Sequence, residues 1–197
     1  KVSVERAFEK EPEAVKEHYI EENLPVATPV FAFGYKENVE DDCCTLEEEI
    51  AMSLILDIAA GQISSLYKEL LDEGLINGTF STEFFNGFNY SAPIFSGEST
   101  DPEKVSERIN ERLQQLKKSG ITSEEFETVR KKQYGKTVRA FSDIDTVANG
   151  LVISHFEDEE LFSEFEVIKN LKLDFVNALL KKSFNEDMTV LSVIKSK

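Results

Sequence analysis

The chain is poor in the residues from which catalytic and redox centres are most often built. It has no tryptophan, two cysteines, two methionines and two histidines among 197 residues. Lysine and arginine together number 22 against 38 aspartates and glutamates, which gives a formal net charge of −16. Phosphate contacts need clustered basic side chains, so this charge argues against generic nucleic-acid binding. It also disfavours binding to anionic membrane surfaces.

Long hydrophobic runs are also missing. No apolar stretch approaches the ~18 residues of a membrane span, and the sequence shows no secretory signal pattern. The two cysteines are adjacent, Cys43 and Cys44, which suits neither an ordinary disulfide nor a shared metal site. Two such cysteines are typical of reduced thiols inside a cell. We therefore expect a cytoplasmic protein that binds neither membrane nor nucleic acid.

The chain does contain enough apolar residues for a core. Hydrophobic residues make up 41% and charged residues 30% of the sequence, which is ordinary for a globular protein. A folded chain of this length buries very roughly 70% of the surface that its unfolded form exposes. Residues 1–12 read as a strap or linker between domains. A single domain is expected over residues 13–197.

Hydrophobic periodicity predicts five strands. They cover residues 15–22, 27–36, 79–90, 92–97 and 188–195. In the third strand one face is aromatic and the other is mostly polar. The aromatic face carries Phe80, Phe84, Phe88 and Tyr90, and the polar face carries Thr79, Ser81, Glu83 and Asn89.

Capping residues mark where several helices start. Thr45 with Glu48 and Thr122 with Glu125 match the capping box, and Asp101 precedes a proline that suits the first helical position. The predicted helices cover residues 45–60, 64–72, 101–118, 122–141, 142–157, 161–171 and 173–184. The order of strands, helices, hairpin, helices and strand indicates an α+β fold. We expect a mostly antiparallel sheet with helices on one face, and the last strand beside the early ones.

The first of these helices is the most apolar one in the chain. Leu54 and Ile58 lie on its apolar stripe, and we expect both of them in the core.

The residues themselves show no catalytic motif. A catalytic zinc usually needs three protein ligands, whereas the only imidazoles are His18 and His155, far apart in sequence and outside any H-x-x-E-H pattern. His155 has two acidic residues one turn later, but it also fits a packed or half-exposed helix histidine. No serine lies in a G-x-S-x-G elbow and no glycine pattern matches a phosphate loop. The chain is therefore expected to hold neither catalytic residues nor a metal site.

Several stretches nevertheless resemble one family in their order and spacing. They are ATPVFAFGYKEN followed by LEEEIAMSLILDIAAGQISSLYKELLDEGLI, then SGITSEEFETVRKKQYGKTVRAFSDIDTVANGL, and finally LKLDFVNALLKKSFNEDMTVLSVI. Over residues 2–194 the chain resembles the C-terminal, zinc-free half of insulinase/pitrilysin-type zinc peptidases, in particular the bacterial relatives of mitochondrial processing peptidase.

The resemblance implies one half of a clamshell that closes around a peptide substrate. Zinc is then expected in a homologous N-terminal half or in a partner subunit, and no cofactor is expected in this chain. The function implied is that of a substrate-enclosing half of a zinc-dependent peptidase. The alternative is a non-catalytic partner subunit or a scaffold protein of the same fold. Whether the whole protein is an enzyme stays open at this point.

The resemblance also suggests substrate-binding residues. The family's C-terminal half often contributes an arginine and a tyrosine in a pattern like V-R-E-x-x-G-L-A-Y. In the matching stretch, Leu71 stands at the arginine position and Asn77 at the tyrosine position, with one residue fewer between them. Leucine cannot donate a hydrogen bond to a reacting peptide, whereas the asparagine amide can. The resemblance also places the strand after this stretch at the inner wall of the clamshell. The implied substrate-binding residues are therefore Leu71, Asn77, Thr79, Ser81 and Glu83.

Overall fold

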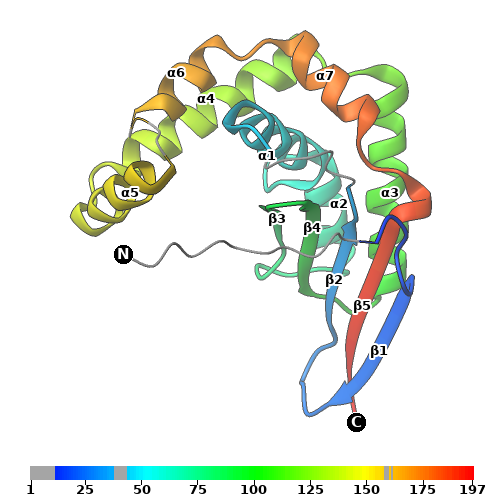
Figure 1. The fold of residues 1–197 in the computed structure, drawn as a ribbon. Coiled ribbons are helices and arrows are strands. Elements are labelled where there is room, and N and C mark those ends of the chain that lie inside the picture. Colours follow the sequence, from blue (N-terminus) through cyan, green and yellow to red (C-terminus); the bar gives the residue numbers. More distant parts are fainter. Residues whose placement is uncertain (1–11, 38–43, 158–159, 161) are drawn as a thin grey trace.

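Helices cover one face of a five-stranded sheet and extend beyond one of its ends (Figure 1). The structure is a computed structural model, and it describes residues 12–37, 44–157, 160 and 162–197. Apart from Pro12, the strap expected over residues 1–12 lies outside the described residues.

The sheet has the order β1-β5-β2-β4-β3. The strands are β1 (Tyr19–Leu24), β2 (Val30–Tyr35), β3 (Ser81–Gly87), β4 (Tyr90–Glu98) and β5 (Thr189–Ser196). Among the described strands, β1 pairs with β5 in parallel and the other pairings are antiparallel. The prediction of a mostly antiparallel sheet is confirmed, and so is the position of the last strand beside the early ones.

The described helices are α1 (Leu46–Ala60), α2 (Ser65–Asp72), α3 (Pro102–Ser119), α4 (Ser123–Ala140), α5 (Ile144–Glu157), α6 (Ser163–Asn170) and α7 (Leu173–Lys182), with a short 3-10 helix over Glu186–Met188. Three of these helices, α1, α3 and α4, begin where capping residues predicted. Both expected capping boxes form, at Thr45 and Thr122, and the Asp101 side chain accepts a hydrogen bond from the Lys104 backbone N–H. These local interactions satisfy backbone donors that a helix start would otherwise leave free.

The core lies between the sheet and its helices. Phe31, Phe33 and Tyr35 of β2 point into it, and α1 contacts the sheet through β3 and the outer helices through α4 and α7. Leu54 and Ile58 of α1 are buried, which confirms the core predicted for this helix.

No single helix of the described residues is long and apolar enough to cross a membrane. Only α1 and α2 taken together meet the length and composition required, with a bend of 42° between them. Most of α1 is buried in the core described above, as is common for the central helix of a packed domain.

The strand predicted over residues 79–90 is too long at both ends, because β3 covers only Ser81–Gly87. After Gly87, Phe88 and Asn89 form a two-residue turn into β4, with Asn89 at a φ of 65°. Asparagine adopts this left-handed conformation more readily than most residues. Phe84 packs against the core as predicted, but Phe88 and Tyr90 are exposed.

The first strand also begins later than predicted. Pairing with β5 starts at Tyr19, and all six residues of β1 are exposed. His18 therefore lies just before the strand. Its ring Nδ1 is 2.8 Å from the carbonyl oxygen of Thr189 at the start of β5.

Candidate functional site

The sheet has a second face, on the side away from the helices, which we call the open face. Side chains alternate along a strand, and residues paired across two strands share a face. The Asn86 side chain of β3 hydrogen-bonds Glu49 of α1 and marks the helix side, so Ser81, Glu83 and Phe85 point the other way. The open face comprises Ile20, Glu22, Val30, Ala32, Gly34, Ser81, Glu83, Phe85, Ala92, Ile94, Ser96, Glu98, Val190, Ser192 and Ile194. None of these residues is buried.

The charge of the open face has one sign. Glu22, Glu83 and Glu98 contribute carboxylates from three strands, and the residues defined above include neither lysine nor arginine. Ser81 and Ser96 lie opposite each other on β3 and β4, with 3.5 Å between their hydroxyl oxygens. The face therefore offers negative charge and hydroxyl groups beside aliphatic side chains and one phenylalanine.

A hydrogen-bond network ties the loop after α2 to the end of β4. The Asn77 Oδ1 atom accepts hydrogen bonds from the Thr79 backbone N–H at 2.9 Å and from the Thr79 hydroxyl at 2.7 Å. The Asn77 amide donates to Glu98 Oε2 at 2.6 Å. The Glu98 backbone N–H in turn donates to Thr79 Oγ1 at 2.9 Å. Asn77, Thr79 and Glu98 thus form one connected unit at the rim of the open face.

The structure brings together most of the residues that the resemblance implied. Asn77 and Thr79 contact each other directly, and Ser81 and Glu83 follow on the open face of β3. Leu71 lies on the last turn of α2, where its side chain is exposed, and it takes no part in the network. Glu98 was missed, because only the pairing of β3 with β4 places it beside Thr79.

The donor groups do not suit a catalytic zinc ion. In the described part of the chain, no three His, Cys, Asp or Glu residues are grouped in a way that could hold a metal. His18 lies against the Thr189 carbonyl at the edge of the sheet, and His155 is exposed on α5. A catalytic zinc usually takes three protein ligands, which these two residues cannot supply.

The described residues thus combine an α+β fold with an open sheet face that carries carboxylates and hydroxyl groups. A family model described as the Peptidase M16 inactive domain matches residues 3–154. The chain belongs to this family. The fold and family predicted from the sequence are thereby confirmed.

Three relatives define the extent of the likeness. The uncharacterized zinc protease YmfH of Bacillus subtilis (strain 168) is 27% identical over 194 residues, covering 97% of this chain and 45% of YmfH. A solved structure from Alicyclobacillus acidocaldarius, described as an M16-like peptidase, has a TM-score of 0.91 and 26% identity, covering 99% of this chain and 47% of that one. The peptidase M16 inactive domain from Pseudomonas fluorescens shares the fold, with a TM-score of 0.75 and 14% identity over 98% of this chain and 46% of that one. This chain thus spans less than half the length of each of them.

We expect the Asn77 network to contribute measurably to stability. Asn77→Ala removes three side-chain hydrogen bonds at an exposed site and should lower the free energy of unfolding by about 1 kcal/mol, a typical net value for such interactions. Asn77→Asp keeps the acceptor toward Thr79 but loses the donor to Glu98 and sets two carboxylates against each other. Urea denaturation of both variants separates the two contacts. Unchanged stability of Asn77→Ala would show that the network does not hold the loop.

Proposed function

We propose that this chain is the C-terminal, substrate-enclosing half of a zinc-dependent peptidase, and that its open face forms one wall of the peptide chamber. The observation that carries the proposal is the match of residues 3–154 to the inactive domain of a peptidase family. Hydrolysis, and the zinc ion that it requires, are assigned to a homologous half or to a partner subunit. We also propose that the protein works in the cytoplasm.

The open face supports this role by its chemistry. An extended peptide needs hydrogen-bonding groups at strand spacing, and Ser81, Ser96 and Glu83 offer them on adjacent strands. The carboxylates of Glu22 and Glu83 attract basic side chains, because complementary charge steers binding and fixes orientation. We propose that this wall binds and orients the peptide and shields it from water.

A non-catalytic partner subunit or scaffold is the second candidate, and one observation favours it. The two positions where the family often places arginine and tyrosine hold Leu71 and Asn77. Leucine has no donor, and one of the two donors of the Asn77 amide already binds Glu98. On this alternative the protein binds peptides without hydrolysing them.

Charge reversal on the open face tests the proposal in the longer protein that contains this chain. We expect Glu83→Lys to lower kcat/KM for peptides rich in lysine and arginine about tenfold, the equivalent of 1.4 kcal/mol. Glu107→Lys is the matched control, because Glu107 is an exposed residue of α3 on the helix side. The readout is hydrolysis of fluorogenic peptides with and without a zinc chelator.

The outcomes separate the two candidates. Chelator-sensitive hydrolysis that Glu83→Lys weakens and Glu107→Lys leaves unchanged supports the peptidase wall. Peptide binding with the same charge dependence but without hydrolysis supports the scaffold. If Glu83→Lys changes neither turnover nor affinity, the open face is not the peptide wall.

A further inference from the structure

Helix α5 turns its largest apolar side chains toward solvent. Each of them is more than half exposed, and Phe156 reaches 82%. The set, which we call the α5 face, is Ile144, Leu151, Val152, Ile153 and Phe156. Surface helices normally turn such residues inward, so these five residues of α5 depart from the usual pattern.

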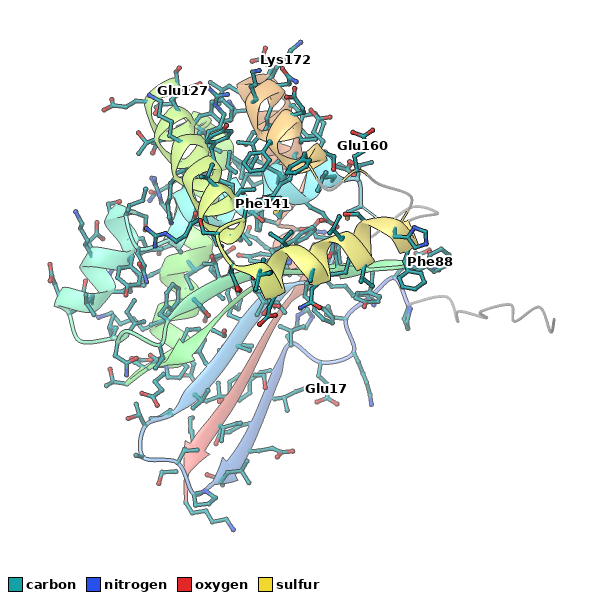
Figure 2. The ribbon with its side chains drawn as sticks, turned by 90° about the vertical axis from the view of Figure 1, so that its left-hand side faces the viewer. Glu17, Phe88, Glu127, Phe141, Glu160 and Lys172 are labelled. Atoms are coloured by element: carbon teal, nitrogen blue, oxygen red, sulfur yellow. The ribbon has the colours of Figure 1, made fainter. Side chains whose placement is uncertain are left out.

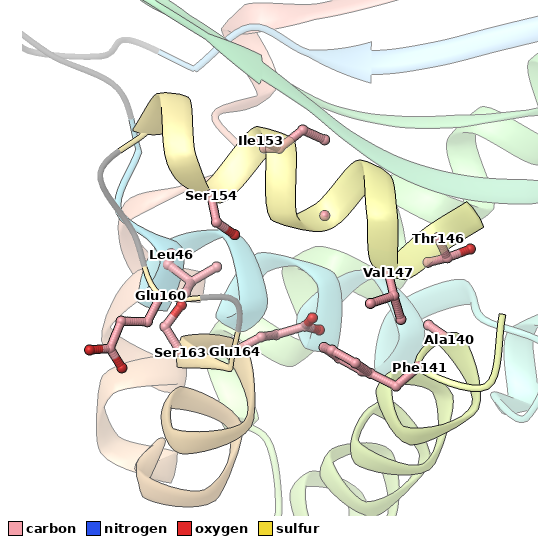
Figure 3. A pocket seen from close by; sticks show the side chains of 11 residues that line it. Leu46, Ala140, Phe141, Thr146, Val147, Ile153, Ser154, Glu160, Ser163 and Glu164 are labelled. Carbon is pink, nitrogen blue, oxygen red and sulfur yellow. The ribbon is translucent and has the colours of Figure 1, made fainter. Parts of the chain in front are cut away.

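The inner side of α5 is lined by smaller groups. Figure 3 shows Val147 and Ser154 on the side facing α4 and α6, and Ile153 also lines the space between these helices. A cavity of about 240 Å³ separates α5 from these helices, bordered by Phe141 and Glu164 among others. This space is open to solvent, so the side chains that border it do not pack against one another there. The contacts within this chain therefore leave α5 loosely packed.

The surroundings of α5 restrict what can cover it. In Figure 1 the helix lies at the far end of the helical layer, away from the strands, and Figure 2 shows it in front of the sheet. Exposed acidic residues lie at its two ends, with Asp143 before it, Asp145 in its first turn and Glu160 after it. These charges oppose contact with an anionic membrane. They favour a partner surface that is apolar in the middle and basic at its rim.

We propose that the α5 face is the surface on which the zinc-binding half of the longer protein docks. The inference rests on the proposed function. In YmfH and in the Alicyclobacillus structure, more polypeptide lies outside the matched region than within it, so a partner of comparable size accompanies this fold. Stable contacts between halves of this size bury apolar centres. The α5 face supplies such a centre.

Thiol labelling of the longer protein tests the docking. Val152→Cys places a thiol on the α5 face, where the native side chain is 56% exposed, and Ile63→Cys places a control thiol after α1, where the native side chain is 48% exposed. Maleimide labelling is followed by peptide mass spectrometry, which separates the new thiols from Cys43 and Cys44. We expect Val152→Cys to react at least about tenfold more slowly than Ile63→Cys, which corresponds to 1.4 kcal/mol of protection. The two rates should become equal in denaturant.

Each outcome bears on one proposal or the other. Equal rates in the folded protein would overturn docking at α5, whether or not peptides are cleaved. Protection that disappears after about hundredfold dilution would assign the face to a second copy by mass action and would also overturn the proposal. Protection that persists on dilution, in a protein without peptidase activity, would support docking while removing the catalytic part of the proposed function.

Discussion

Replacing Leu54 by alanine should lower the free energy of unfolding by about 2 to 5 kcal/mol, the largest change expected of any single substitution considered for this chain. The Leu54 side chain is 1% exposed, on a helix that packs against β3, α4 and α7. Truncation removes apolar contacts and leaves a cavity that surrounding elements can fill only in part. Urea or thermal denaturation measures the change.

The control for this prediction is Ile63→Ala. Ile63 follows α1 by three residues and is exposed, so its truncation should change stability by less than ~0.5 kcal/mol. A loss below ~1 kcal/mol for Leu54→Ala would contradict the packing of α1. Similar losses of stability in Leu54→Ala and Ile63→Ala would show that burial in the structure does not account for the effect of truncation.

The second large effect is expected at Glu37. Phe184 lies just before the short 3-10 helix in a left-handed conformation, with φ at 60°, and its side chain is fully buried. The Glu37 Oε1 atom accepts the Phe184 backbone N–H at 2.7 Å. The Tyr35 ring meets the Phe184 ring edge-on at 5.2 Å, and Lys117 donates to the Ser183 carbonyl at 2.7 Å. A residue other than glycine keeps this strained backbone conformation only when contacts from its surroundings hold it there.

We therefore expect Glu37→Ala to lower the free energy of unfolding by about 1 to 3 kcal/mol, because it leaves the buried Phe184 N–H without a partner. Glu37→Gln is the matched variant, since its amide oxygen can still accept this hydrogen bond. Stability of Glu37→Ala close to that of Glu37→Gln would show that the acceptor is dispensable.

The buried carboxyl group of Glu37 should also make the free energy of unfolding depend on pH. Burial raises the pKa of Glu37 above its ordinary value of 4.5, although the Phe184 N–H and the charges of Lys117 and Lys182 act in the opposite direction. The folded state then holds the proton more tightly than the unfolded state, so this group's stabilising effect declines as the pH rises from 4.5 to the raised pKa. Relative to Glu37→Gln, the native protein should lose stability over that window. The free energies of unfolding of both proteins can be measured by urea denaturation across this pH window. A constant difference between the two proteins would contradict the prediction.

Local signals were sufficient to predict the helices and the centre of the core. A capping box needs only residues three positions apart, and Thr45 with Glu48 and Thr122 with Glu125 form it as expected. The apolar pattern around Leu54 likewise indicated burial. These features depend on short-range geometry, which the sequence carries directly.

Features that depend on distant residues were harder to predict. The turn residues Phe88 and Asn89 are not the Asn-Gly pair typical of a two-residue hairpin, so the predicted strand ran through the turn to residue 90. The link from Asn77 to Glu98 depends on the register of β3 and β4. The sequence predicted a helix at α5, but hydrophobic periodicity alone does not show which face of that helix contacts another domain.

The position of β5 also has a consequence for how the protein is made. β5 is the last of the described strands in sequence, yet it lies between β1 and β2, and its Leu191 N–H bonds the carbonyl of His18 at 2.8 Å. During translation, the edges of β1 and β2 that pair with β5 therefore stay unpaired until nearly the whole domain has been made. Unpaired strand edges readily join other chains, and contacts so far apart in sequence form slowly. Until β5 emerges, these two strand edges are therefore open to pairing with other chains.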